Sequence, residues 1–188
     1  MEKLINYILQ FGNLDTQEIE IITNSVTELQ IRKDEYFSKA GSIPHFVGFV
    51  TEGVLRGCYY NNRGEEITRC FISENSLVVD YANFEVNAAS TEYIQACTHC
   101  NLLVFTKQSW EDLSHTIKGW DVIKNRIVQK CLYQKSRKSP VISHNATIRY
   151  SEFMENYPSL INRVALSHIA SYLGVTQQSL SRIRKNIQ

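Results

Sequence analysis

The chain has 188 residues and a net charge of +1, with 43% hydrophobic and 21% charged residues, which are the proportions of a soluble globular protein. Its length suits one sizeable core plus a small second unit. Residues 1–11 lack the continuous apolar segment of a secretory signal, no apolar run is long enough to cross a bilayer, and five scattered cysteines favour reduced cytoplasmic thiols over a disulfide framework.

The small net charge conceals an asymmetry along the chain. Residues 1–119 hold 9 Lys and Arg against 16 Asp and Glu, whereas residues 120–188 hold 11 against 3. An acidic first part joined to a basic last part is typical of a phosphate-binding module attached to a regulator that does not itself bind phosphate. A chance fluctuation is the weaker alternative, because the basic part also carries the helical motif described below.

Two short helices are predicted at the N-terminus. Within residues 1–11, Leu4, Ile5, Ile8 and Leu9 fall on one helical face. Asp15 followed by Glu18 resembles a capping box, which indicates the start of a second helix. Both helices are interpreted as packing elements.

From Leu29 to Thr106, short runs rich in β-branched and aromatic residues alternate with turn residues. We expect strands near residues 35–38, 46–51, 54–60, 66–72, 77–79, 93–97 and 102–106. Asn61-Asn62-Arg63-Gly64 predicts a hairpin turn, because Asn and Gly accept positive φ, and Glu52-Gly53 predicts another tight turn. Many short strands indicate a small antiparallel barrel or roll, which can hold a small ligand or be filled with side chains.

Helices are predicted again after the roll. A short one opens at Ser109 and a longer one runs from Trp120 to about Ser139. The long helix carries an apolar stripe that can pack on its own domain or pair with the same helix of a second subunit. Pairing is favoured, because a DNA-binding helix pair commonly acts as a two-fold dimer. The stripe that forms this expected dimer interface consists of Trp120, Ile123, Ile127 and Cys131.

The last part of the chain is expected to be helical. Pro140 breaks the helical pattern, Asn145 can cap a following helix, and Tyr157-Pro158 ends that helix. The segment from Leu166 to Ile183 then has the spacing of two helices joined by a tight turn.

Within this segment, Gly174 lies where a helix end takes up positive φ, and Thr176 can cap the second helix. That second helix buries Leu180 and Ile183. It exposes a polar set that favours a DNA-reading helix-turn-helix over the alternative of an ordinary helical hairpin. This set consists of Gln177, Gln178, Ser181, Arg182, Arg184 and Lys185.

The order of roll, long helix and C-terminal helix-turn-helix resembles the cyclic AMP receptor/fumarate-nitrate regulator (Crp/Fnr) family of bacterial transcription factors. The resemblance covers nearly the whole chain and is carried most clearly by VGFVTEGVLRGCYYNNRGEE and HIASYLGVTQQSLSRIRKNI. It implies an α+β fold in which residues 1–117 form an antiparallel β-roll like the cyclic-nucleotide-binding double-stranded β-helix, preceded by N-terminal helices. Residues 118–144 are then the dimerisation helix and hinge, and residues 145–188 the helix-turn-helix domain.

The resemblance further implies a cytoplasmic homodimer that is not an enzyme, that binds double-stranded DNA and contacts RNA polymerase, and that has no membrane partner. By the motif, the base-reading positions fall on Gln177, Gln178 and Arg182. Gln suits adenine and Arg suits guanine, because each pair allows two hydrogen bonds. Ser181, Arg184 and Lys185 are expected at phosphates, and the capping residue Thr176 is also expected at the DNA interface.

The roll departs from the cyclic AMP-binding members of that family. Val79-Asp80 stands near the ribose-binding Gly-Glu pair, and Ser90-Thr91 near the phosphate-binding Arg-Ser segment. Burying a phosphodiester without a cationic partner is costly, so we expect no cyclic AMP and an effector of unknown identity. A less anionic ligand would lie near Tyr81, Thr91 and Tyr93. We also expect no β-hairpin wing after the second helix, because the sequence stops at Gln188.

The cysteines and histidines do not predict a metal site. Cys97-Thr98-His99-Cys100 has the spacing of half a zinc site, but no second pair completes four ligands, so buried thiols at a hairpin are favoured. The five histidines are dispersed, and His168 is expected to be structural. The alternative function is a small cupin-like barrel that acts as a metal-dependent enzyme or ligand-binding protein, with a helical tail.

Overall fold

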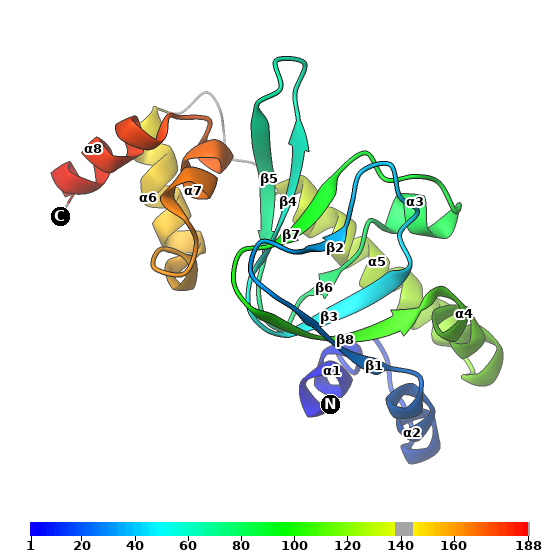
Figure 1. Ribbon diagram of the computed structural model, residues 1–188. Helices are drawn as coiled ribbons and strands as arrows, with labels where there is room; N and C mark the ends of the chain where they lie inside the picture. Colours follow the sequence, from blue (N-terminus) through cyan, green and yellow to red (C-terminus); the bar gives the residue numbers. More distant parts are fainter. Residues whose placement is uncertain (138–144, 188) are drawn as a thin grey trace.

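The computed structural model describes residues 1–137 and 145–187, so the predicted break at Pro140 and the end of the long helix at Ser139 lie outside the described residues. A roll of β-strands occupies the centre of the molecule, with two N-terminal helices at one end and the long helix α5 behind it (Figure 1). The C-terminal helices α6 to α8 lie to one side, next to strand β5.

The roll consists of two four-stranded antiparallel sheets, with strand orders β1-β8-β3-β6 and β2-β7-β4-β5. The strand bounds are β1 Thr27–Ile31, β2 Tyr36–Ser38, β3 Phe46–Glu52, β4 Leu55–Tyr60, β5 Glu66–Ile72, β6 Leu77–Val78, β7 Tyr93–Ala96 and β8 Cys100–Thr106. The antiparallel roll and the mixed helix and sheet class are therefore confirmed.

All seven predicted strands are present, and one further strand, β1, was not predicted. In β1 only Ile31 is buried and Leu29 half-buried, so just two apolar residues mark the strand, which is a short signal for a half-buried strand. Both predicted turns form. Gly64 has φ +75°, and the Asn61 side chain accepts hydrogen bonds from the backbone N–H groups of Arg63 and Glu65. Gly53 has φ +102°, and a Cβ there would come within 2.5 Å of the His99 carbonyl oxygen.

The space between the two sheets contains a cluster of buried apolar side chains. Sheet one supplies Ile31, Val50 and Leu102, and sheet two supplies Leu55 and Ile94. Of the two interpretations left open by the sequence, a roll filled with side chains fits this region.

The helices around the roll are α1 Glu2–Ile8, α2 Thr16–Asn24, α3 Tyr81–Glu85, α4 Lys107–Thr116 and α5 Trp120–Arg137. The capping box of Asp15 and Glu18 is confirmed, with bonds of 2.8 and 2.9 Å. The prediction that Ser109 opens α4 is wrong: Thr106 caps that helix by accepting the Ser109 backbone N–H at 3.1 Å. No helix among the described residues combines the length and apolar character needed to span a bilayer.

The stripe assigned to a dimer interface packs inside the chain instead. Trp120, Ile123 and Ile127 have exposed fractions of 0%, 5% and 1%, and they share one buried cluster with side chains of α1, α4 and the roll. Gly12 lies so close to Ile123 that a Cβ on it would come within 2.6 Å of the isoleucine. Cys131 is half-buried beside Tyr7. Our preference for a partner subunit at the three buried positions is therefore wrong, because the chain's own helices cover them.

Candidate DNA-binding interface

The C-terminal unit is built from α6 Ala146–Asn156, the 3-10 turn η1 Pro158–Leu160, α7 Leu166–Leu173 and α8 Gln177–Ile187. Asn145 caps α6 by accepting the Ile148 backbone N–H at 3.0 Å, as predicted. Thr176 precedes α8 and accepts the Ser179 backbone N–H at 3.1 Å. Helices α6 and α8 therefore each begin at a side chain that satisfies an otherwise unpaired amide.

Helices α7 and α8 are joined by a tight turn at Gly174. This glycine is in the left-handed region, at φ +64° and ψ +37°, and the backbone N–H of Val175 returns to the Ala170 carbonyl at 3.0 Å. An L-residue with a side chain pays about 1–2 kcal/mol in that conformation, which explains why glycine is needed there. The predicted pair of helices with a glycine turn is confirmed as a local structure.

The apolar side of α8 fixes its orientation on α7. Leu180 is fully buried and Ile183 half-buried, and both join a cluster that includes Phe153, Ile169 and Leu173. The opposite side of α8 therefore faces outward. Of the residues predicted to bind DNA, Thr176, Gln177, Gln178, Arg182 and Lys185 are exposed, and Ser181 and Arg184 are half-buried.

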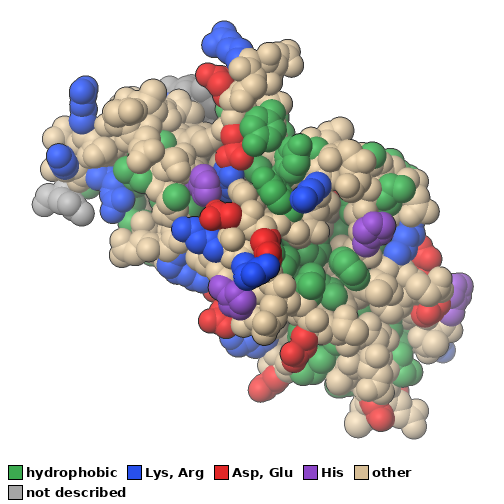
Figure 2. All heavy atoms as spheres, in the orientation of Figure 1, with side chains coloured by type: hydrophobic (Ala, Val, Ile, Leu, Met, Phe, Trp, Pro, Cys, Tyr) green, Lys and Arg blue, Asp and Glu red, His purple; other side chains and the backbone are tan. Residues whose placement is uncertain are grey.

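The charge of this unit suits a polyanion. Helix α8 carries Arg182, Arg184 and Lys185 and has no acidic residue. On the face shown in Figure 2, Lys and Arg side chains gather over the C-terminal helices at the left, whereas Asp and Glu side chains lie mainly over the roll and the N-terminal helices. The charge asymmetry of the sequence is thus an asymmetry in space.

Arg149, which the sequence analysis did not select, makes a hydrogen bond next to the Gly174 turn. Arg149 of α6 donates a hydrogen bond from a terminal nitrogen to the Leu173 carbonyl, at the C-terminal end of α7. Cations are favourable there, because helix carbonyls without partners give that end a partial negative charge.

A second arginine lies buried where the roll meets the C-terminal unit. Arg56 of β4 is 2% exposed and pairs with Glu66 at 2.5 Å. It also donates to the Gln95 side chain at 2.6 and 3.0 Å and to the Thr68 hydroxyl at 2.9 Å. With these partners the buried charge is compensated.

His168 of α7 reaches this junction, where its Nδ1 lies 3.9 Å from the Cys97 Sγ. Burial and the positive charge of Arg56 lower the pKa of His168 below its usual value. The neutral imidazole is therefore the form that fits the contact between α7 and the roll.

The six residues proposed for a ligand pocket divide among three places. Asp80 is buried, and its carboxylate accepts hydrogen bonds from the Ser90 hydroxyl at 2.7 Å and the Asn83 amide at 2.8 Å. Val79 and Tyr81 pack against the cluster that contains α1 and α5.

The other two predicted pocket residues lie elsewhere on the roll, Tyr93 at the start of β7 and Thr91 in the loop just before it. Tyr93 lies between the rings of Tyr36 and Tyr60, at 5.5 and 5.7 Å. Thr91 lines a cavity of about 570 Å³ between the β4–β5 hairpin and α7, together with Tyr60 and Arg149. The fold therefore brings Asp80 and Ser90 together, while Thr91 lines a separate cavity, and a ligand pocket at these residues stays a prediction.

Cys97 and Cys100 are buried, as predicted, but the predicted hairpin is wrong, because the turn between them joins β7 and β8, which lie in different sheets. Burial raises the pKa of the Cys97 thiol to about 12 and that of Cys58 to about 11, so both stay protonated at neutral pH. Among residues 1–137 and 145–187, no group of three or more His, Cys, Asp or Glu is placed to hold a metal ion.

No protein-family model and no curated protein matches this sequence. The fold does match solved structures. FixK2 from Bradyrhizobium japonicum has a TM-score of 0.72 and 16% identity, over 86% of this chain and 84% of that one.

Two further structures match over most of their length. The c-di-GMP-responsive global regulator CLP of Xanthomonas campestris has a TM-score of 0.69 and 14% identity, over 93% of this chain and 92% of that one. A putative Crp/Fnr regulator from Eubacterium rectale has a TM-score of 0.69 and 14% identity, over 97% of this chain and 88% of that one. The chain thus has the fold of the Crp/Fnr regulators.

Proposed function

We propose that this chain is a sequence-specific DNA-binding transcription regulator of the Crp/Fnr type. The observation that carries the proposal is the geometry of α8. Leu180 and the Gly174 turn hold this helix on α7, while a polar and cationic side without acidic residues faces outward. The fold it shares with transcription regulators supports the same function.

In this proposal α8 enters the major groove. Gln177, Gln178 and Arg182 are exposed and lie on the outward side, so their side chains reach base edges. The remaining polar residues position the helix on the backbone. Lys185 contacts phosphate directly, and the half-buried Ser181 and Arg184 do so from the flank of the helix. The Thr176 hydroxyl is engaged in capping, so its contribution is to fix the N-terminus of α8.

We further propose a homodimer formed by the outward side of α5. Val122, Leu132 and Tyr133 are 55%, 49% and 59% exposed. Val122, Asn125, Gln129 and Leu132 follow the alternating three- and four-residue spacing of a helix pair that packs along a seam, and Tyr133 lies beside Leu132. This seam replaces the buried stripe, and a two-fold pair presents two α8 helices to half-sites about 34 Å apart.

The roll, in this proposal, does not take cyclic AMP. The carboxylate of Asp80 is already held by Ser90 and Asn83, and a second anion beside it would be repelled. The division into residues 1–117, 118–144 and 145–188, the cytoplasmic location and the contact with RNA polymerase remain proposals that rest on the fold alone. No observation favours the alternative of a metal-dependent barrel enzyme.

Selection from a randomised duplex library with the full-length chain tests the proposal. We expect enrichment of a palindrome whose half-sites lie one helical turn, or a multiple of it, apart. A variant with Gln177→Ala and Arg182→Ala is the matched control and should lose the motif. Failure of the wild-type chain to enrich any sequence at low salt would contradict the proposed function.

A further inference from the structure

In the contact between α7 and the roll, a serine hydroxyl of α7 makes hydrogen bonds to backbone groups of β5. Strand β5 is one of the two edge strands of its sheet. At its outer edge, the Ser171 hydroxyl accepts the Thr68 backbone N–H at 2.9 Å and donates to the Glu66 carbonyl at 2.9 Å. One hydroxyl thus satisfies a donor and an acceptor of the edge, which a methyl group or a carboxylate could not both do.

An apolar side chain of the same strand, Phe71, packs against the C-terminal helices. Phe71 is 1% exposed, and its ring lies 5.4 Å from the Tyr172 ring and 5.9 Å from the Phe153 ring. Val54 and Cys97 of the roll belong to the same buried cluster as the core of the C-terminal unit. The roll and the helix-turn-helix therefore share a core, so relative movement of the two would open it.

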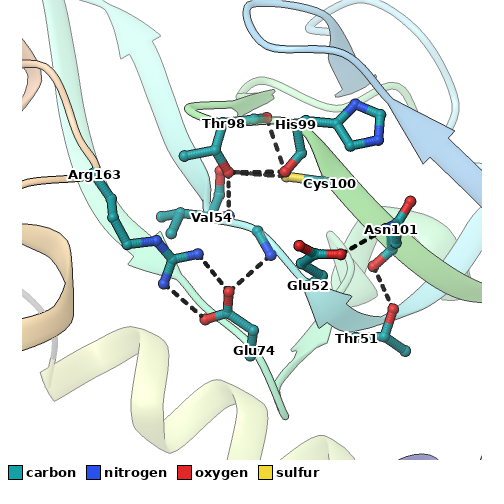
Figure 3. A network of polar contacts seen from close by, with 10 residues as sticks. Thr51, Glu52, Val54, Glu74, Thr98, His99, Cys100, Asn101 and Arg163 are labelled. Carbon is teal, nitrogen blue, oxygen red and sulfur yellow. Dashed lines mark hydrogen bonds and ion pairs between the residues drawn. The ribbon is translucent and has the colours of Figure 1, made fainter.

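A charged contact forms a second attachment, ahead of the N-terminus of α7. The Arg163 guanidinium and the Glu74 carboxylate point toward each other, and Glu74 also accepts the backbone N–H of Gly53 at 2.8 Å (Figure 3). Burial alone would raise the pKa of Glu74, but these hydrogen bonds hold that pKa below its usual value. The adjacent N–H of Val54 is bonded to the Thr98 hydroxyl at 2.9 Å, so the turn that receives Arg163 is itself fixed.

These two attachments lie at opposite ends of α7. Arg163 precedes the helix, and Ser171 lies in its last turn. Since Leu180 holds α8 on α7, the direction in which α8 points is fixed relative to the roll and its long helix. We propose that Ser171 is a positioning residue for DNA readout: through β5, it sets the angle at which each subunit of a dimer presents α8. This inference rests on the proposed function.

A positioning role for Ser171 affects the spacing between half-sites, which a purely stabilising role would not. A single half-site is read by one α8 helix, whose own structure does not depend on the attachment. A full palindrome requires two α8 helices at a fixed separation and phase. Each inserted base pair turns one half-site by about 35° and moves it by about 3.4 Å. Loosening the attachment should therefore relax the requirement for spacing and leave half-site binding nearly unchanged.

The experiment uses the full-length chain and the palindrome recovered from the randomised library. Binding is titrated on that duplex, on duplexes with one base pair inserted or removed between the half-sites, and on a single half-site. Ser171→Ala is compared with Ser167→Ala, a matched control at an exposed serine of the same helix. Arg163→Gln, at the other attachment, is a second variant that keeps the test informative should Ser171→Ala fold poorly. Hydrogen exchange at the Thr68 amide reports the contact without DNA.

In Ser171→Ala the Thr68 amide should exchange faster, and the preference for the correct spacing should fall about threefold to tenfold, which is the loss expected from one hydrogen-bonded group. Half-site affinity should stay within about twofold, and Ser167→Ala should behave as wild type. Arg163→Gln should also lower the preference for the correct spacing. Unchanged spacing preference in both attachment variants, with wild-type binding intact, would overturn the inference. A wild-type chain that recovers no DNA sequence would overturn the proposed function, and the inference with it.

Discussion

Replacing Phe71 with alanine tests whether the roll and the C-terminal helices share one core. The Phe71 ring is 1% exposed and packs against Phe153 and Tyr172 across the junction. Removal of a buried phenylalanine ring costs about 3–5 kcal/mol, because apolar burial is lost and a cavity remains. For a chain of this length, each kcal/mol shifts the melting temperature by about 2–4 °C, so Phe71→Ala should lower it by about 6–20 °C.

The assay is thermal and denaturant unfolding followed by circular dichroism, with hydrogen exchange resolved along the chain. Phe71→Leu keeps most of the apolar volume and should cost clearly less than the alanine variant. In Phe71→Ala, exchange should accelerate on both sides of the junction, in β5 and in α7. A loss below about 1 kcal/mol, or acceleration confined to β5, would refute the shared core, because either result means that the C-terminal unit does not cover the ring.

Three further predictions concern the dimer, pH and the roll. Tyr133→Asp places a charge in the proposed seam and should yield monomers in sedimentation, and an unchanged dimer would count against the seam. Ile127→Asp should instead lower the free energy of unfolding, because Ile127 is buried. Because the folded-state pKa of His168 is lowered, the folded chain resists protonation there. The free energy of unfolding should then fall as pH drops below about 6.5, and this group contributes at most about 1.4 kcal/mol per pH unit to that fall. His168→Asn should make the fall shallower. Identical pH curves for the variant and the wild type would exclude a contribution of His168 to the pH dependence of stability. Calorimetry should detect no binding of cyclic AMP at micromolar concentrations, and micromolar affinity would refute our interpretation of Asp80.

The elements that the sequence predicted correctly are those marked by local chemistry. Asp15 with Glu18, Asn145, Gly174 and Thr176 each lie where backbone groups need a particular side chain or a positive φ, and the structure has the expected turn or cap at each position. Such signals depend on a few neighbouring residues, so a single sequence carries them in full.

What the sequence did not predict depends on contacts between distant segments. The stripe of α5 is equally suited to an internal core or to a partner, and only the position of α1 and Gly12 beside Ile123 decides between them. Arg56 was missed because an arginine within a strand is expected at the surface, and its burial is compensated by Glu66, Thr68 and Gln95 on other strands. Ser171 carries no motif, since its partners are backbone groups about a hundred residues earlier in the chain.

The most direct test of the DNA-reading assignment compares Arg182→Ala with Lys185→Ala on the selected palindrome and on scrambled DNA, at several salt concentrations. Arg182→Ala should cost about 1–3 kcal/mol on the palindrome and relax the preference at one base pair per half-site, because its guanidinium reads a base. Lys185→Ala should weaken binding to both DNAs alike and lower the salt dependence by about one unit per half-site, because its ammonium neutralises a phosphate. Equal losses on both DNAs for Arg182→Ala would contradict the assigned reading face of α8.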